Sequence, residues 1–183
     1  MNIDVSMINK RAPYHVNATD ANNNIDFVTD YGVQYIVGFD KDDTSLSFVT
    51  YQFFITNANN IKSPRDPKLR KTITAILEVF FQQNNEALLY ICETGDGKQS
   101  MRSRLFEFWY NHYEGRKILM FLEASVVDAD GVVNYTALLI RKDHPQLTEI
   151  VTEYTNTVKL LNDKPKEAQF REGERLMDNI HIV

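Results

Sequence analysis

The sequence predicts a single α+β domain over residues 1–161, with a mixed, largely antiparallel sheet. Apolar residues recur at every second position in several short runs, which is the period of a strand with one buried face. Two later segments carry apolar residues at helical spacing and alternate with strands. The chain has 183 residues, of which 43% are hydrophobic and 25% charged, as expected for one soluble globular core.

Four strands are expected upstream of residue 57. The run 31–39 places aromatic and β-branched residues on one face: Tyr31, Val33, Tyr35, Val37 and Phe39. The run 47–56 alternates in the same way and has the composition that strands favour. Asp42-Asp43-Thr44 between these runs is typical of a hairpin connection. Two shorter strands are expected near residues 14–16 and 25–28, joined by an Asn-rich turn over residues 18–24.

A helix is expected over residues 67–83. Asp66 followed by Pro67 is typical of an N-cap with proline at the first helical position. Apolar residues then recur at helical spacing: Leu69, Ile73, Ile76, Leu77, Phe80 and Phe81. The continuously apolar run 87–92 follows, as in a strand covered on both faces.

A second helix is expected over residues 98–112, because Asp96 and Gln99 have the spacing of a capping box. It carries apolar residues at helical spacing, Met101, Leu105 and Phe108, with Phe106 and Trp109 alongside. The strand 117–127, apolar on both faces, then pairs with residues 132–140 through a hairpin turn at 128–131. A last helix starts at Pro145, and the mixed-charge residues 162–183 are expected to form a loosely held tail.

Charge and composition exclude several classes of function. Twenty Lys and Arg against 25 Asp and Glu give a net charge of −5, which argues against wholesale binding of nucleic acid or of an anionic membrane. No segment is long and apolar enough to span a bilayer, and no secretory signal follows Met1. The single Cys92 cannot form an internal disulfide. We therefore expect a cytoplasmic protein.

Glycine is scarce, and this bears on phosphate binding. The chain has seven glycines and none between Gly38 and Gly95, whereas average usage is about 7%. The spacing of a phosphate-binding P-loop, GxxxxGK[ST], is also absent. A glycine-lined phosphate loop is therefore not expected.

Basic residues nevertheless gather at the starts of both predicted helices. If both helical connections are right-handed crossovers, the two helix starts lie at one end of the sheet, where open α/β sheets bind ligands. A cation in the first turn of a helix is unfavourable unless an anion lies nearby. The candidate residues for a small anionic ligand or cofactor are Arg65, Lys68, Arg70, Lys71, Lys98 and Arg102. The alternative is that these are solvated side chains whose repulsion is screened.

The order of antiparallel strands, then strand, helix, strand, helix and hairpin, over about residues 31–141, resembles the Gcn5-related N-acetyltransferase fold. In that family a loop with Arg or Gln and two glycines opens the first of these helices and holds the pyrophosphate of acetyl-CoA. The corresponding residues 65–70 keep Arg65 and lack both glycines. The tyrosine general acid of the family corresponds to Phe106, with Tyr110 or Tyr113 as substitutes at a different spacing, and Glu93 is a candidate base.

Two further stretches carry a second resemblance. Residues 66–81 and 89–109, the latter including DGKQSMRSRLFEFW, are similar to an uncharacterised bacterial family known only as a domain of unknown function. The similarity spans about residues 25–160. It implies a cytosolic bacterial protein and supplies no activity.

The remaining motifs favour structural roles. Cys92 lies in an apolar strand, where a buried, inert thiol is expected. The four histidines lack metal-ligand spacing, so no metal site is expected: His15, His112, His144 and His181. Residues 95–100 and 128–131 are typical of a helix cap and a hairpin turn, not of phosphate and calcium loops. The second helix mixes Arg102 and Arg104 with aromatic residues, which suits a protein interface or stacked bases if those rings are not in the core.

The sequence thus favours a non-catalytic binding or regulatory domain without a cofactor, because the positions that carry the chemistry of the resembled enzymes are missing. Its partner would be a protein or a small anionic ligand. The alternative is an N-acyltransferase-like enzyme that holds an acyl-CoA through an atypical pyrophosphate loop. The sequence leaves open whether the chain is an enzyme, what it binds and whether it oligomerises.

Overall fold

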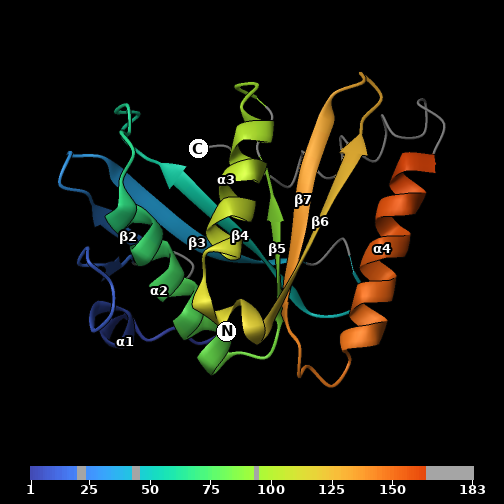
Figure 1. Ribbon diagram of the computed structural model, residues 1–183, viewed down its shortest axis with the longest axis horizontal. Coiled ribbons are helices and arrows are strands. Elements are labelled where there is room, and N and C mark those ends of the chain that lie inside the picture. The colour runs from blue at the N-terminus through green and yellow to red at the C-terminus, as the bar shows by residue number, and fades with distance from the viewer. Residues whose placement is uncertain (20–23, 43–45, 93–94, 164–183) are drawn as a thin grey trace. The chain divides into compact units, whose positions relative to one another are not determined.

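The computed structural model describes residues 1–19, 24–42, 46–92 and 95–163. This part of the chain contains four α-helices, one 3-10 helix and seven strands (Figure 1). The predicted α+β class is therefore confirmed. The chain divides into two compact units, one of residues 1–41 and 51–88 and one of residues 42–50 and 89–183. A single domain over residues 1–161 stays a prediction.

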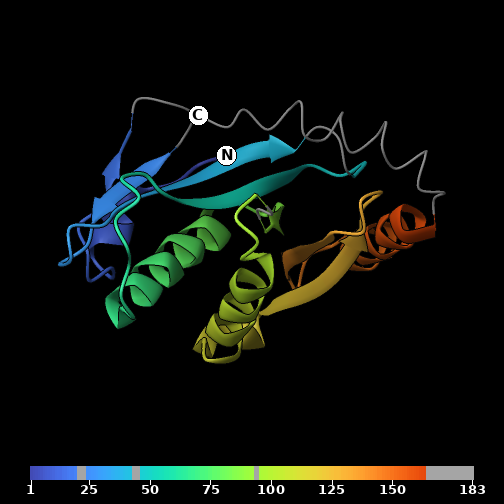
Figure 2. The same ribbon diagram turned by 90° about the horizontal axis from the view of Figure 1, so that it is seen from above.

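The first unit pairs short strands in chain order and packs a long helix against them. Its elements are α1 (Val5–Asn9), β1 (Asn17–Ala18), β2 (Ile25–Val28), β3 (Gln34–Asp42), β4 (Thr50–Asn57) and α2 (Pro67–Gln83); the last residue of β3 and the first of β4 belong to the second unit. The strand order is β1-β2-β3-β4, and the β1–β2 and β2–β3 pairs are antiparallel. Figure 2 shows α2 lying along one face of these strands.

Helix α2 spans residues 67–83, as predicted, and its apolar stripe forms much of the core of this unit. The Asp66 side chain accepts a hydrogen bond from Lys68 N at 2.9 Å, which caps the helix. Ile76 and Phe80 are completely buried. The Phe80 ring stacks on Phe39 of β3, with 4.9 Å between the ring centroids.

Several boundaries in the first unit differ from the prediction. Helix α1, capped by Asp4, was not expected, because five residues are too few to show helical periodicity. A strand near residues 14–16 was expected, whereas β1 comprises residues 17 and 18. Strand β3 begins only at Gln34, because Gly32 has φ 73° and closes a turn by donating its N–H to Thr29 O. Residues 20–23 and 43–45, in the predicted Asn-rich turn and hairpin connection, lie outside the described residues.

The second unit is built around a β-hairpin. Its elements are β5 (Ala87–Ile91, whose first two residues belong to the first unit), α3 (Gln99–Asn111), the 3-10 helix η1 (Glu114–Lys117), β6 (Leu119–Val127), β7 (Val133–Arg141) and α4 (Leu147–Asp163). The strand order is β5-β7-β6. The β6–β7 hairpin lies between α3 and α4 (Figures 1 and 2).

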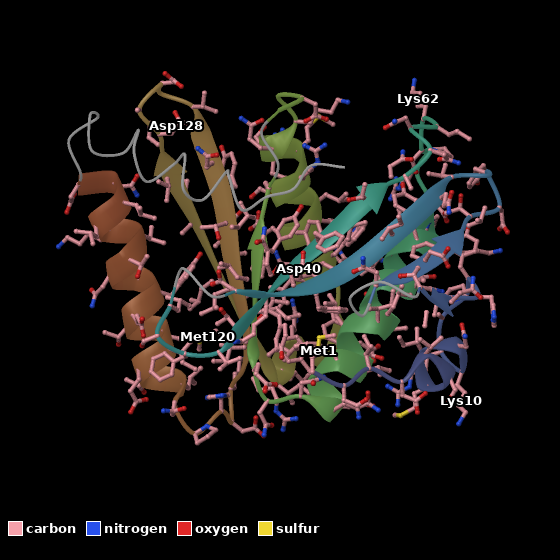
Figure 3. The ribbon with its side chains drawn as sticks, turned by 180° about the vertical axis from the view of Figure 1, so that it is seen from behind. Met1, Lys10, Asp40, Lys62, Met120 and Asp128 are labelled. Carbon is pink, nitrogen blue, oxygen red and sulfur yellow. The ribbon has the colours of Figure 1, made fainter. Side chains whose placement is uncertain are left out.

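The hairpin is regular along its whole length, as the sequence predicts. Every residue of β6 pairs with one of β7, from Leu119 with Arg141 to Val127 with Val133. Gly131 supplies the positive φ of 80° that the turn requires. Asp128, at the turn in Figure 3, accepts hydrogen bonds from Asp130 N and Val132 N.

Helix α3 starts as predicted but not by a capping box. The N-cap is Lys98, which makes no side-chain cap bond. Gly97, at φ 68°, sets Asp96 in a turn before the helix, where its carboxylate accepts from Lys98 N. The helix contacts the rest of its unit through aromatic residues: the Phe106 and Tyr90 centroids lie 3.9 Å apart, and those of Tyr110 and Phe121 5.1 Å apart.

The apolar stripe of α3 is exposed to solvent, whereas that of α2 is largely buried. Met101, Leu105 and Phe108 are exposed at 60%, 45% and 43%. Helical spacing predicted the helix correctly, but it does not predict which face is covered.

Helix α4 begins at Leu147, just after the predicted start, and continues to Asp163. The first two residues of the predicted tail are therefore helical, and the rest, 164–183, lies outside the described residues. No helix in the described ranges has the length and apolar content needed to cross a membrane.

Candidate functional site

A hollow of about 470 Å³ opens between α3 and the β6–β7 hairpin. Its volume lies within the range of about 300–1,000 Å³ that is usual for small-molecule sites. Polar and charged side chains dominate its lining: Ser100, Ser103, Arg104 and Glu107 from α3, Glu123, Ala124 and Ser125 from β6, and Tyr135 from β7. All of these residues belong to the second unit.

Glu123 of β6 is one of the two carboxylates in this lining. It pairs with Ala137 across the hairpin, and the buried Ser103 of α3 donates a hydrogen bond to its Oε1. Partial burial raises the pKa of Glu123, and the carboxylate of Glu107 raises this pKa further. The hollow therefore brings together two carboxylates that repel each other.

Arg104 and Glu107 line the hollow without forming ion pairs. Arg104 Nε donates to Ser100 O, 3.2 Å away in the preceding turn of α3. Among the described residues, no carboxylate lies within 4.0 Å of the Arg104 guanidinium and no cation within 4.0 Å of Glu107 or Glu123. Within the described part of the chain, these three side chains therefore have no oppositely charged partner.

Cys92 sits in the packed interior next to the hollow. It is 2% exposed and lies among the aromatic residues Tyr90, Phe106 and Phe121, with Ser103 and Glu123 also nearby. Burial raises the pKa of the Cys92 thiol, which keeps it protonated and unreactive. The expected structural role of Cys92 is consistent with this geometry.

The chain matches the model of a family of unknown function, DUF6169, over residues 65–156. That match covers half of the chain. The chain belongs to this family. No curated protein and no solved structure gives a significant match to it.

All the residues that line the hollow lie within the DUF6169 match. The predicted resemblance to a domain-of-unknown-function family is thus confirmed. The bacterial origin and the likeness to the acetyltransferase fold stay predictions.

In this DUF6169 protein, the basic residues at the start of α2 lie in the first unit. Arg65, Lys68 and Lys71 are exposed, and Arg70 is half-buried. Lys68 Nζ donates to Asp30 Oδ2 at 2.6 Å, a contact that raises the pKa of Lys68. Asp66 caps the helix and also accepts from Tyr14 Oη at 2.7 Å. An internal carboxylate thus supplies the negative charge that the helix start requires.

The basic residues at the start of α3 are also paired internally. Arg102 donates to both Asp96 oxygens at 2.7 Å each, and Lys98 Nζ lies 3.4 Å from the same carboxylate. The Arg102 guanidinium holds the pKa of Asp96 well below its usual range. Lys98 and Arg102 belong to the second unit, whereas the four residues at α2 belong to the first.

The acid–base candidates that the acetyltransferase resemblance suggested either make other contacts or lie outside the described residues. Tyr110 Oη donates to Leu119 O at 3.0 Å, which ties α3 to β6. Glu93 lies outside the described residues. Among the residues that are described, no three His, Cys, Asp or Glu side chains gather closely enough to hold a metal ion.

Sequence reasoning did not single out Glu123, Glu107 or Ser103. One signal for Glu123 was available, because it is the only charged residue in the otherwise apolar or small run 118–127. A lone acid in a half-covered strand indicates either a solvent-facing position or a functional one. Only the packing of α3 over the hairpin distinguishes these two possibilities.

Proposed function

We propose that this protein is a binding domain that holds a small organic amine in the hollow between α3 and the hairpin. The supporting observation is that Glu107 and Glu123 face one hollow without a cationic partner among the described residues. An ammonium group between them would replace repulsion by attraction, because an opposite charge within about 4–6 Å favours ionised carboxylates.

The rest of the lining fits an amine as well. Ser100, Ser103 and Ser125 contribute hydroxyl groups, which accept hydrogen bonds from an ammonium. Calcium, by contrast, takes about six to eight oxygen ligands and several carboxylates. Two glutamates without a third acidic neighbour suit an ammonium better than a metal ion.

Calorimetric titration of the full chain with butylamine and 1,4-diaminobutane tests the proposal, with 1-butanol as the uncharged reference. We expect saturable binding of the amines and none of the alcohol. Glu107→Gln and Glu123→Gln should each weaken amine binding about tenfold, the effect of losing about 1.4 kcal/mol.

Glu114→Gln is the matched control. Glu114 is exposed in η1 of the same unit and does not line the hollow. Its replacement should leave amine binding unchanged. Absence of amine binding, or equal binding by all three variants and the parent chain, would refute the proposed function.

An N-acyltransferase-like function is the second candidate, and it is favoured by the surplus of positive charge at the start of α2. Four basic side chains lie there with two acidic ones, Asp30 and Asp66; the basic residues are Arg65, Lys68, Arg70 and Lys71. The backbone fits a pyrophosphate poorly, because Pro67 has no N–H and Lys68 N already donates to Asp66. The basic side chains, and not backbone N–H groups, would have to bind the pyrophosphate.

A thermal-shift titration with acetyl-CoA and longer acyl-CoAs tests this second candidate. Saturable stabilisation that disappears in Lys68→Ala and Arg70→Ala, together with amine-dependent release of the CoA thiol, would support it. No shift with any acyl-CoA would exclude it and leave the amine-binding proposal intact.

A further inference from the structure

We infer that the ligand of the hollow is an amino acid, held by its ammonium group at Glu107 and Glu123 and by its carboxylate at Arg104. This inference rests on the proposed amine-binding function and goes beyond it by naming a second charged group on the ligand.

The position of Arg104 carries the inference. Arg104 and Glu107 lie three residues apart on α3, so their side chains are neighbours on one face of the helix. Both line the same hollow as Glu123. Yet within the described ranges neither carboxylate lies within 4.0 Å of the guanidinium.

The contact that Arg104 does make orients it. Nε donates to Ser100 O, which holds the base of the guanidinium along the helix. No hydrogen bond of its two terminal nitrogens to another described residue is present. A guanidinium offers two parallel N–H groups that match the two oxygens of a carboxylate.

Arg102 on the same helix shows the contrast. Its terminal nitrogens bind both oxygens of Asp96 at 2.7 Å. The protein thus satisfies one arginine with its own carboxylate and leaves the other, two residues away, facing the hollow. A ligand carboxylate at Arg104 would reproduce the arrangement that Asp96 makes with Arg102.

The charges of the lining match those of the ligand. Two carboxylates and one guanidinium carry opposite charges on one surface, and an ammonium and a carboxylate on one molecule complement both. Ala124 is the single aliphatic residue in the described lining. We therefore expect an amino acid with a small or polar side chain.

The experiment is a calorimetric titration of the full chain with four matched ligands. 4-Aminobutyrate and L-2-aminobutyrate carry both charges at different separations, butylamine carries only the ammonium, and butyrate only the carboxylate. We expect at least one aminobutyrate to bind about tenfold more tightly than butylamine, and butyrate not to bind.

Variants separate the two ends of the ligand. Arg104→Gln should abolish the gain that the carboxylate gives, so that this variant binds the aminobutyrate no more tightly than it binds butylamine. Glu107→Gln should weaken both ligands. Arg104→Lys, which keeps the charge but not the paired N–H groups, should restore part of the lost affinity. Urea unfolding of each variant confirms that it is folded.

The outcomes distinguish the inference from the function on which it rests. If butylamine binds and the added carboxylate gives no gain, or if Arg104→Gln weakens both ligands equally, the amino-acid inference is wrong and the amine site stands. If neither butylamine nor an aminobutyrate binds, both are wrong. Binding of butyrate alone would also overturn both.

Discussion

Aspartate side chains of the protein itself pair with basic residues at the starts of both helices. Asp66 caps α2 and accepts from Tyr14, while Asp30 pairs with Lys68. Asp96 accepts from Lys98 N and holds Arg102. Cations in a first helical turn suggested a bound anion, but internal carboxylates also offset such cations. Composition alone cannot separate these cases, because Asp30 is 38 residues away from Lys68 in the sequence.

Replacement of Glu123 by Gln is expected to stabilise the fold at neutral pH. The folded state raises the pKa of Glu123 above its ordinary value of 4.5, so it binds more protons than the unfolded state in the window above that value. The free energy of unfolding therefore falls as pH rises through this window. Glutamine removes the charge and keeps an oxygen that can accept from Ser103.

Urea unfolding at pH 4 and pH 7 measures this effect. Glu123→Gln should exceed the parent chain in stability at pH 7, and the difference should shrink towards pH 4. Glu114→Gln corrects for the loss of one negative charge. A Gln variant less stable than the parent at pH 7 but not at pH 4 would contradict the expectation. A binding residue that costs stability is common, because function and stability often compete.

Gly38 of β3 is a site where an added methyl group is expected to destabilise the first unit. A Cβ at this position would overlap the Phe54 ring and the Asn24 side-chain oxygen. We expect Gly38→Ala to lower the free energy of unfolding by about 1–3 kcal/mol, the usual cost of overpacking. Urea unfolding measures it. In a Phe54→Ala background the same change should cost less; an equal cost in both backgrounds would rule out the clash as the cause.

At the scale of elements, α4 covers the free edge of β6. Strand β6 has only β7 as a neighbour in the strand order. Asn162 of α4 accepts from Val127 N at 3.1 Å and donates to Ser125 O at 2.9 Å. One amide side chain thus pairs with two backbone groups of the edge, as an additional strand would. Covered edges resist pairing with other chains.

Asn162→Ala should therefore lower stability and promote self-association. Loss of these two exposed hydrogen bonds to the edge predicts a decrease of about 0.5–1.5 kcal/mol in the free energy of unfolding. Urea unfolding and sedimentation velocity measure the two effects. Asn156→Ala is the matched control, because Asn156 is exposed on the same helix without a hydrogen bond to a described residue. Equal behaviour of the two variants would contradict a role for Asn162 at the edge.

Local sequence signals predicted the helices and strands, whereas the candidate site depends on tertiary contacts between them. The Asp66-Pro67 start gave α2 its correct bounds, and the turn at 128–131 gave the hairpin, because both signals lie within a few residues. The capping box at Asp96 failed because the N-cap is Lys98, two residues later, and the Gln99 side chain donates to Val133 O instead of back to the Asp96 backbone. The hollow requires Glu107 and Glu123 to meet across two elements, which no spacing in the sequence encodes.

At the scale of the whole molecule, the DUF6169 segment does not coincide with either unit. Residues 65–156 include α2 but not the strands of the first unit that cover its apolar face. Phe80 of α2 contacts Phe39 and Tyr51, both outside the segment. The bounds of the family match therefore differ from those of the two compact units.

A fragment of residues 65–156 is expected to lack a stable first core. Ile73, Ile76 and Phe80 are 1%, 0% and 0% exposed in the full chain, and the fragment leaves them without β1–β4. We expect broad, poorly dispersed amide signals in a two-dimensional NMR spectrum, against well-dispersed signals for the full chain. Well-dispersed signals for the α2 residues in the fragment would show that this helix needs no strand partner.

The unbroken hairpin that carries Glu123 also has a consequence for folding kinetics. Its paired residues are close in sequence, so its loops close at low entropic cost and its contacts can form early. Trp109, the single tryptophan, lies in the same unit and reports on it by stopped-flow fluorescence. Gly131→Ala strains the turn at φ 80° and should slow refolding more than it speeds unfolding. An effect confined to the unfolding rate would place the hairpin late in folding.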